Sequence, residues 1–450
     1  MKRKCLAIVI ILLFFGTSTI PVIAQNIKKN SLVIVNNNWL DFGCNELKKF
    51  FNENNEFTKF KKRFFPISIR NNDDLKGFRG KLRGVVSGNG TEDNPYVISG
   101  WELQSRKLFI LLFHNKDGIH FENINKHVII KNNYIHDFNN EYADAIELIN
   151  CRNITVEQNI VARSDSGITS YGLDNFISNC SIQYNTIYEN KYGITTAYSK
   201  DVVLNNTIFD NTQRGITCNN ANALVANNEI ASNYDGIWLI GEENSIITQN
   251  KIYGNKRNGI LAGFEVQYTL PTSIISHNEI SSNGKWGISC WIPMRTIICN
   301  NSINSNGWDG IYISESSPTI IDNTISANGG CGIYNSGYLP FRIEHNNITR
   351  QRKGIYSYLS DSLSITNNSI TQNVEIGIEC QSSHPQIHDN NFQGNGYAVV
   401  GDGWMGLVNA TWNWWGAANG PGGSGPGDGD PINNHVDYTP WLTAPNPNSG

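Results

Sequence analysis

Two short stretches of the sequence carry the residue types best suited to chemistry. DGIH begins at Asp117 and DAIE begins at Asp144, so each stretch starts with an aspartate and ends three places later with a titratable side chain, His120 or Glu147. If the stretches stack in neighbouring units of a repeat, Asp117 lies beside Asp144 and His120 beside Glu147. Carboxylates a few ångströms apart repel, which raises the pKa of one or recruits a cation. These four residues are the predicted catalytic candidates for a polysaccharide lyase or hydrolase.

A second interpretation of the same residues is that they only decorate a polar exterior. Exterior positions of a repeat protein carry polar side chains in any case, and some acidic residues align by chance. His136, Asp137 and Arg163 lie nearby in the sequence and are candidates to join the cluster in space. The sequence leaves catalysis, cation or carbohydrate binding, and simple solvation open.

A set of aromatic residues forms the second candidate site. Tyr312, Tyr334 and Tyr356 each stand two places after a glycine, in three successive units. Trp238 occupies the corresponding position, two places after a glycine, in an earlier unit. Stacked units would align the tyrosines in a stripe. An exposed stripe predicts a groove that binds a glycan chain, whereas a buried stripe is part of the core. These four residues are the predicted ligand-binding residues.

The units that must position both sets follow the phrase N-x-I-x-x-N-x-x-G-I, repeated about every 22 residues. Its first isoleucine falls at Ile135, Ile160, Ile187, Ile208, Ile230, Ile252, Ile280, Ile303, Ile325, Ile348 and Ile370, with Phe392 in the twelfth place. The residue two places earlier is Asn in every unit except the second, which has Gln158. Chance does not produce this pattern.

A period near 22 suits a leucine-rich repeat or a coil of a β-helix. The leucine-rich pattern needs several leucines and a helical half, and neither occurs here. Short runs rich in Ile, Val and Tyr alternate instead with Asn, Gly and Ser, which predicts three short strands per unit. Stacking the units pairs each strand with its copy in parallel. We therefore predict an all-β, single-stranded right-handed parallel β-helix of about twelve or more coils.

Both repeated asparagines and the glycine before the second isoleucine have structural explanations. Asparagine tolerates left-handed dihedral angles at a corner, and its amide can bond to the amide of the next coil. Glycine is typical of a tight bend. We assign these positions to the scaffold, and we expect function at positions that break the phrase.

The chain divides into four predicted parts. Residues 1–24 have the basic start, apolar run and small-residue end of a signal peptide, with an uncleaved membrane anchor as the alternative. Residues 25–83 form an irregular or capping segment, 84–400 the β-helix, and 401–450 a Trp- and Gly-rich cap and tail. The longer coils predict loops at 170–175 and 264–271.

Two aspartates in the tail, Asp428 and Asp430, are candidates to bind Ca²⁺, although carboxylates in such a loop are more often only solvated. The net charge of −4 gives no general attraction to nucleic acid. No stretch after the leader is apolar enough to cross a bilayer. The sequence therefore predicts a secreted or cell-surface protein without a membrane span after signal cleavage.

Three features together resemble a known group of proteins: the repeated phrase, the lead-in GNGTEDNPYVISGWEL, and the tail NWWGAANGP with VDYTPWL. They resemble exported right-handed β-helix repeat proteins related to NosD and to the carbohydrate-binding and sugar-hydrolase (CASH) domain, over about residues 84–443. The resemblance implies the fold and export, but no one activity, because this fold hosts lyases, hydrolases, epimerases and adhesins. NosD is linked to copper-centre assembly, and the three Met and nine scattered His here form no copper-ligand cluster.

Three functions remain. The first is binding of extracellular or cell-surface carbohydrate along the solenoid. The second is a polysaccharide lyase or hydrolase at the acidic stretches. The third is a structural surface protein or adhesin without a catalytic site.

Overall fold

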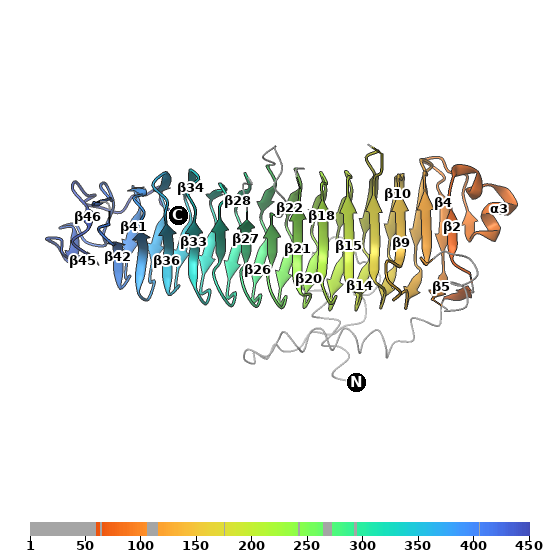
Figure 1. The fold of residues 1–450 in the computed structure, drawn as a ribbon, viewed down its shortest axis with the longest axis horizontal. Coiled ribbons are helices and arrows are strands. Elements are labelled where there is room, and N and C mark those ends of the chain that lie inside the picture. The colour runs from red at the N-terminus through yellow and green to blue at the C-terminus, as the bar shows by residue number, and fades with distance from the viewer. Residues whose placement is uncertain are drawn as a thin grey trace, which may run out of the picture. The chain divides into compact units, whose positions relative to one another are not determined.

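A computed structural model describes residues 60–63, 65–105, 116–174, 176–241, 244–263, 272–291, 295–404 and 406–450. The predicted signal peptide, residues 25–59 of the predicted capping segment, and the predicted loop at 264–271 lie outside these residues. The described residues belong to one compact unit, Phe60–Gly450. Figure 1 shows its strands stacked one after another along a single axis.

Three parallel sheets run the length of this unit, and each coil adds one strand to each sheet. Sheet A consists of β1 (Lys61–Arg63), β5 (Trp101–Gln104), β8 (Tyr134–His136), β11 (Ile160–Ala162), β14 (Thr186–Tyr188), β17 (Thr207–Phe209), β20 (Glu229–Ala231), β23 (Lys251–Tyr253), β26 (Glu279–Ser281), β29 (Ser302–Asn304), β32 (Thr324–Ser326), β35 (Asn347–Thr349), β38 (Ser369–Thr371) and β41 (Asn391–Gln393). Sheet B consists of β2 (Ile67–Ile69), β6 (Ile119–Glu122), β9 (Asp144–Ile149), β12 (Ser166–Tyr171), β15 (Tyr192–Ala197), β18 (Arg214–Asn219), β21 (Asp235–Ile240), β24 (Ile260–Ala262), β27 (Ile288–Trp291), β30 (Ile311–Ser314), β33 (Cys331–Ser336), β36 (Lys353–Tyr358), β39 (Ile376–Gln381), β42 (Tyr397–Gly401), β45 (Gly429–Ile432) and β44 (Pro421–Gly423).

Sheet C consists of β3 (Val85–Ser87), β4 (Tyr96–Ser99), β7 (Val128–Lys131), β10 (Arg152–Glu157), β13 (Asn179–Gln183), β16 (Val202–Leu204), β19 (Leu224–Ala226), β22 (Ile246–Thr248), β25 (Ile274–Ser276), β28 (Ile297–Cys299), β31 (Thr319–Ile321), β34 (Phe341–Glu344), β37 (Leu363–Thr366) and β40 (Gln386–His388). The pair β3–β4 is antiparallel. A short pair of β43 (Val408–Asn409) and β46 (Val436–Asp437), a 3-10 helix η3 (Asn72–Leu75) and a helix α3 (Gly77–Leu82) complete the described elements. The predicted right-handed parallel β-helix is confirmed.

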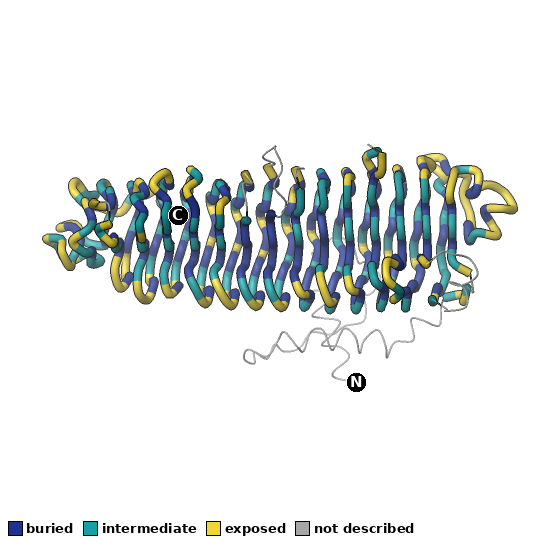
Figure 2. Tube along the Cα trace, in the orientation of Figure 1, coloured by how far each residue is buried: buried dark blue, intermediate teal, exposed yellow. Residues whose placement is uncertain are grey.

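The core of the β-helix is a set of isoleucine stacks. Successive side chains of a strand point to opposite faces, and the inward positions of all three sheets are buried, as the banding in Figure 2 shows. In sheet A, for example, Ile208, Ile230, Ile252 and Ile280 pair in register and are fully buried. Each buried isoleucine contributes about 1.5–3 kcal/mol relative to an exposed one.

The second coil departs by one residue from the predicted alignment. Val161, not Ile160, lies in the inward stack, and Asn159, not Gln158, occupies the asparagine position. Ile160 is only partly buried. The prediction was wrong here because Gln158 and Ile160 reproduce the letters of the phrase, while the adjacent Asn159 and Val161 fit the interior.

Two ladders of asparagine side chains run along the interior, as predicted. The first ladder contains Asn133, Asn159, Asn185, Asn206, Asn228, Asn250, Asn278, Asn301, Asn323, Asn346, Asn368, Asn390 and Asn413. The second contains Asn190, Asn211, Asn233, Asn255, Asn283, Asn306, Asn328, Gln351, Asn373 and Asn395. In both, the backbone N–H donates to the side-chain oxygen of the next coil, and at most rungs the side-chain amide donates to the same oxygen.

Left-handed dihedral angles occur one residue before each ladder position rather than on the ladder asparagine itself. Asn227 and Ser232 have φ of 54° and 58°, directly before Asn228 and Asn233. The expectation of left-handed ladder residues was wrong, because a ladder side chain must point inward while its predecessor makes the corner and points outward.

The repeated glycines are required by space rather than by a bend. A Cβ on Gly259 would lie 2.6 Å from the carbonyl oxygen of Gly287 and 2.6 Å from Cγ2 of Ile280. Its φ is not in the left-handed range. Glycine therefore lets adjacent coils approach each other, which corrects the predicted tight bend.

Both ends of the β-helix carry covering elements. Sheets A and B begin at Lys61 and Ile67, before residue 84, where the β-helix was predicted to begin. At the other end the fully buried Trp415 stacks on Phe392 with ring centroids 5.1 Å apart. In the described part of the chain, no helix has the length and apolar composition needed to cross a membrane.

The tail aspartates make hydrogen bonds within this cap. Asp430 accepts the N–H groups of Gly394 and Asn395, each at 2.8 Å, and so ends the second ladder. Asp428 accepts from Nδ2 of Asn419 at 2.8 Å. The calcium site predicted at these aspartates remains a prediction, with the Asp430 carboxylate engaged by the ladder.

Candidate functional site

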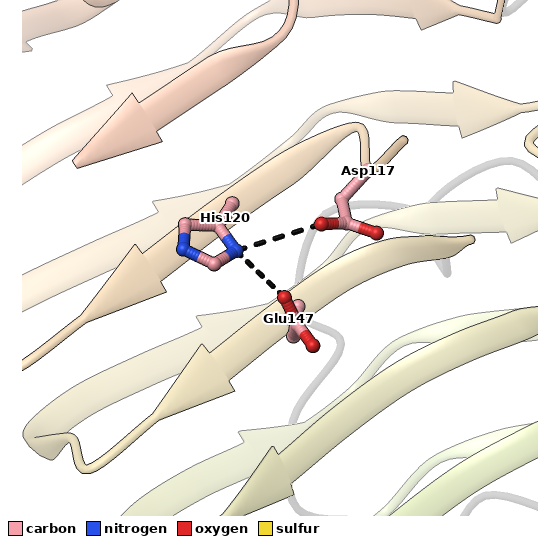
Figure 3. A group of neighbouring side chains, drawn as sticks. All are labelled: Asp117, His120 and Glu147. Atoms are coloured by element: carbon pink, nitrogen blue, oxygen red, sulfur yellow. Dashed lines mark hydrogen bonds and ion pairs between the residues drawn. The ribbon is translucent and has the colours of Figure 1, made fainter. Parts of the chain in front are cut away.

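The candidate site lies on the exterior of sheet B, where β6 and β9 are adjacent strands. His120 pairs in register with Glu147. Ile119 and Phe121, on either side of His120, are fully buried and point inward, so alternation directs His120 outward. The predicted stacking of the two acidic stretches is thus observed, and Figure 3 shows Asp117, His120 and Glu147 converging on one point.

Short distances join these side chains. His120 Nδ1 lies 2.6 Å from Glu147 Oε2 and 3.5 Å from Asp117 Oδ2. Asp144, the fourth predicted residue, is next to them, because its backbone N–H donates to Asp117 Oδ1 at 3.0 Å. All four side chains are mostly buried.

Burial and charge shift the pKa values of this cluster in opposite directions. Burial works to lower the pKa of His120, but its hydrogen bonds and charge interactions with Asp117 and Glu147 outweigh burial and raise that pKa to about 9. Burial raises the pKa of Asp144 to about 7, against a hydrogen bond from Ser166 and reinforced by the charge of Glu147. His120 therefore keeps its proton to a higher pH than a free imidazole does, and Asp144 beside it is about half protonated near pH 7.

The donor atoms also suit a metal ion. One ligand atom from each of Asp117, His120 and Glu147 lies within 4.8 Å of the others. No other set of three His, Cys, Asp or Glu side chains in the described residues meets this condition.

The predicted aromatic residues lie on the same sheet and in the same exterior row as His120. Following the strand pairs from β2 to β42, this row reads Ser68, His120, Glu147, Thr169, Thr195, Thr217, Trp238, Leu261, Ser289, Tyr312, Tyr334, Tyr356, Glu379 and Val400. Tyr312 is seven coils from Glu147, or roughly 34 Å at about 4.8 Å per coil. Six of the eight predicted site residues therefore share one row. His120 and Glu147 belong to an acidic region, Tyr312, Tyr334 and Tyr356 belong to an aromatic region, and Trp238 lies between the two.

The three tyrosines form the aromatic region. Tyr312 and Tyr334 stack with centroids 5.2 Å apart, and Tyr334 and Tyr356 with centroids 4.9 Å apart. The sequence left open whether this stripe is interior or exterior, and the structure places it outside, partly buried. Because the rings stack face to face, they present edges and hydroxyl groups to solvent. They do not form the broad flat platform expected of a sugar-stacking stripe.

A tryptophan cluster extends the stack at its first coil. Trp286 stacks on Tyr312 at 4.5 Å, and Trp308 packs edge-on against Trp286 at 5.2 Å. Trp308 is 46% exposed, and Lys285 Nζ lies 4.4 Å from its ring centroid. Trp308 therefore adds a partly exposed aromatic ring beside the tyrosine stack.

Trp238 does not join the tyrosine stack. Leu261 and Ser289, both buried, separate it from Tyr312 in the row. The guanidinium of Arg214 covers one face of Trp238, 3.2 Å from the ring centroid. The structure therefore places Trp238 in a cation–π pair rather than in the aromatic region.

Sequence reasoning missed two residues of the acidic region. The Tyr171 hydroxyl donates to Glu147 Oε1 at 3.1 Å, and Glu122 Oε2 lies 3.7 Å from His120 Nε2. Glu122 is two places after His120, so strand alternation could have placed it on the same face. Tyr171 reaches back from the next coil, for which the sequence carries no signal.

Three residues expected near the acidic cluster belong elsewhere. His136, Asp137 and Arg163 form a network at sheet A, with His136 Nδ1 2.7 Å from Asp137 Oδ2 and Arg163 Nε 2.6 Å from Asp137 Oδ1. Within one coil, sheets A and B face different directions. Nearness in the sequence was therefore misleading.

The family model described as "Right handed beta helix region" matches residues 84–224, 117–270, 214–356 and 286–408. These overlapping matches cover most of the chain. The chain belongs to the right-handed β-helix family. The finer resemblance to NosD and the CASH domain remains a prediction, and no curated protein sequence matches at a significant level.

Solved structures of other β-helix proteins are similar over much of their length. A periplasmic alginate epimerase, AlgG, has 15% identity and a TM-score of 0.48, covering 60% of this chain and 84% of that chain. The A-module of the Azotobacter vinelandii mannuronan C-5 epimerase AlgE6 has 14% identity and a TM-score of 0.46, covering 67% and 87%. The tailspike of an E. coli bacteriophage, solved with a pentasaccharide, has 11% identity and a TM-score of 0.45, covering 69% and 68%. At these values the likeness is one of fold.

Proposed function

We propose that this member of the right-handed β-helix family is exported and binds an extracellular or cell-surface polysaccharide along the exterior of sheet B. The observation that carries the proposal is the aromatic region itself: Trp286, Trp308, Tyr312, Tyr334 and Tyr356 on one outer face, in successive coils. Export rests on the predicted signal peptide. A protein found only inside the cell would contradict it.

The geometry supports a chain ligand rather than a small molecule. The tyrosines repeat at the coil spacing of about 4.8 Å, which is close to the length of one sugar in an extended glycan. Their edges and hydroxyl groups suit hydrogen bonds to sugar hydroxyls, while the partly exposed ring of Trp308 suits contact with a sugar ring. Lys285, beside Trp308, adds a cation that favours acidic sugars.

Binding to a panel of neutral and acidic polysaccharides tests this proposal. We expect Trp308→Ala to weaken binding of the best ligand at least about tenfold, since such aromatic anchors typically contribute more than 1 kcal/mol. Trp404→Ala is the matched control, because Trp404 is 77% exposed but lies in the C-terminal cap, after β42, and not beside the tyrosine stack. No binding to any polysaccharide, or equal loss in both variants, would contradict the proposal and favour a structural protein or adhesin.

A second candidate function is cleavage of the bound polymer at the acidic region. It is favoured by the position of Asp117, His120, Asp144 and Glu147 on the same outer face as the aromatic region, where carboxyl and imidazole groups meet at one point. New reducing ends or unsaturated uronides from a polysaccharide panel would establish cleavage. Activity retained in Asp144→Ala would remove this residue from the proposed site.

A further inference from the structure

We propose that Asp117, His120 and Glu147 bind a divalent transition-metal ion of the Zn²⁺ type on the exterior of sheet B. Glu147 of this site is seven coils from Tyr312 in the exterior row, so metal binding can be measured separately from polysaccharide binding. It uses one imidazole nitrogen and two carboxylate oxygens, which are ligand types that Zn²⁺ accepts.

The three donor atoms are close to the spacing that a metal requires. His120 Nδ1 is 2.6 Å from Glu147 Oε2 and 3.5 Å from Asp117 Oδ2, and all three donors lie within 4.8 Å. Metal–ligand bonds of about 2.1 Å in tetrahedral geometry separate the donors by roughly 3.4 Å. Small side-chain adjustments on two adjacent strands of a rigid sheet therefore suffice.

Each ligand is oriented by a second contact on its other polar atom. The N–H of Asp144 holds Asp117 Oδ1 at 3.0 Å and leaves Oδ2 for the metal. The Tyr171 hydroxyl holds Glu147 Oε1 at 3.1 Å and leaves Oε2. Outer contacts of this kind fix ligand geometry in metal sites, and their loss typically weakens metal binding 10–100-fold.

His120 has the corresponding arrangement. Its Nε2 is buried without a hydrogen bond and lies 3.7 Å from Glu122 Oε2, while Nδ1 faces the carboxylates. A metal-bound imidazole usually directs its second nitrogen to a carboxylate. A small rotation would convert this approach into a hydrogen bond and fix the tautomer with a free Nδ1. Metal binding would then release the Nδ1 proton to solvent.

The local charge also favours a cation. Within the described residues, Glu122, Asp144 and Glu147 form no ion pair with lysine or arginine. Ca²⁺ and Mg²⁺ prefer all-oxygen ligand sets, so the imidazole nitrogen selects a transition metal. Three ligands on a sheet exterior leave one position open for water or for an oxygen of a ligand.

Calorimetric titration of tag-free, chelator-treated protein with Zn²⁺, Mn²⁺ and Ca²⁺ tests the site. We expect one Zn²⁺ bound per chain, with at least tenfold weaker binding in Glu147→Gln and in His120→Gln. Glu229→Gln is the matched control, because Glu229 also accepts a tyrosine hydroxyl on an exterior strand, from Tyr253 at 2.7 Å, but belongs to no such group of ligands.

A spectroscopic measurement on the unmodified chain protects the test against variants that fail to fold. Co²⁺ bound by one nitrogen and carboxylate oxygens should give visible d–d bands that Zn²⁺ displaces. No Co²⁺ spectrum and no Zn²⁺ heat, unchanged Zn²⁺ binding in folded Glu147→Gln, or a clear preference for Ca²⁺ would each overturn the assignment.

Discussion

The acidic and aromatic regions lie along the same exterior row of sheet B, yet their side chains are stabilised by different interactions. In the acidic region, His120 is held by groups from two neighbouring coils through charge and hydrogen bonds. In the aromatic region, Tyr334 stacks on a tyrosine in each neighbouring coil. A repeated apolar side chain therefore stabilises itself along a solenoid, whereas a repeated carboxylate must recruit something of opposite charge.

The largest effect on this comparison is expected from His120→Leu. Removing the imidazole leaves Glu147 and Asp117 facing each other in a mostly buried site, and loss of one partner of such a pair costs about 3–5 kcal/mol. Denaturant unfolding in the presence of a chelator measures the change. A loss below about 1 kcal/mol would show that the acidic region does not depend on its cation.

Asp201→Asn examines a carboxyl group inside the cylinder rather than outside it. Asp201 is fully buried, its Oδ1 accepts the N–H of Cys180 at 2.7 Å, and burial raises its pKa to about 6. A raised folded-state pKa means that the folded protein binds the proton more tightly than the unfolded chain. The protonated Asp201 therefore contributes its full stabilisation of the folded state below about pH 4, and this stabilisation is lost as the pH rises through about 6.

We therefore expect Asp201→Asn to be more stable than the unmodified protein by about 2–3 kcal/mol at pH 7, with the difference vanishing below about pH 4. Unfolding at a series of pH values measures it. Asp174→Asn, at an exposed position, is the control and should show no such dependence. A pH-independent difference for Asp201→Asn would contradict the assignment.

Tyr334→Leu tests self-stacking in the aromatic region. Tyr334 stacks on both Tyr312 and Tyr356, and each aromatic pair contributes about 0.5–1.5 kcal/mol beyond its buried area. We expect a loss of about 1–2 kcal/mol in unfolding free energy. Tyr338→Leu, at a 64% exposed position, should change stability little. Equal effects would mean that the stack is not stabilising.

Arg352→Ala should have the smallest effect. Arg352 forms an ion pair with Glu375 at 2.9 Å, with both side chains about half exposed. Such surface pairs contribute about 0–1 kcal/mol and are screened by salt. We expect a change below about 0.5 kcal/mol at moderate ionic strength. A larger loss would contradict the interpretation of this contact as a weak surface ion pair.

The repeat made the fold and much of the exterior row predictable. Stacked copies share a register, so His120 beside Glu147 and the alignment of Tyr312 with Tyr334 followed from phase alone. The structure differs from the predicted alignment where two adjacent residues both fit the repeated phrase, as Ile160 and Val161 do. Side-chain reach across coils, as from Tyr171, and ring orientation, as in the tyrosine stack, depend on rotamers that no spacing encodes.

The asparagine ladders have a direction, and it bears on how such a chain can change in length. Each ladder backbone N–H donates to the side-chain oxygen of the following coil, and each ladder side-chain oxygen accepts from the preceding coil, so any interior coil is interchangeable with its neighbour. Only the termini differ: the N–H of Trp101 donates to Oδ1 of Asn133, the first oxygen of the first ladder, and Asp430 accepts the last hydrogens of the second ladder. A gene encoding this architecture can therefore gain or lose whole coils by unequal recombination without leaving a ladder amide unpaired, provided that Trp101 and Asp430 remain at the two ends.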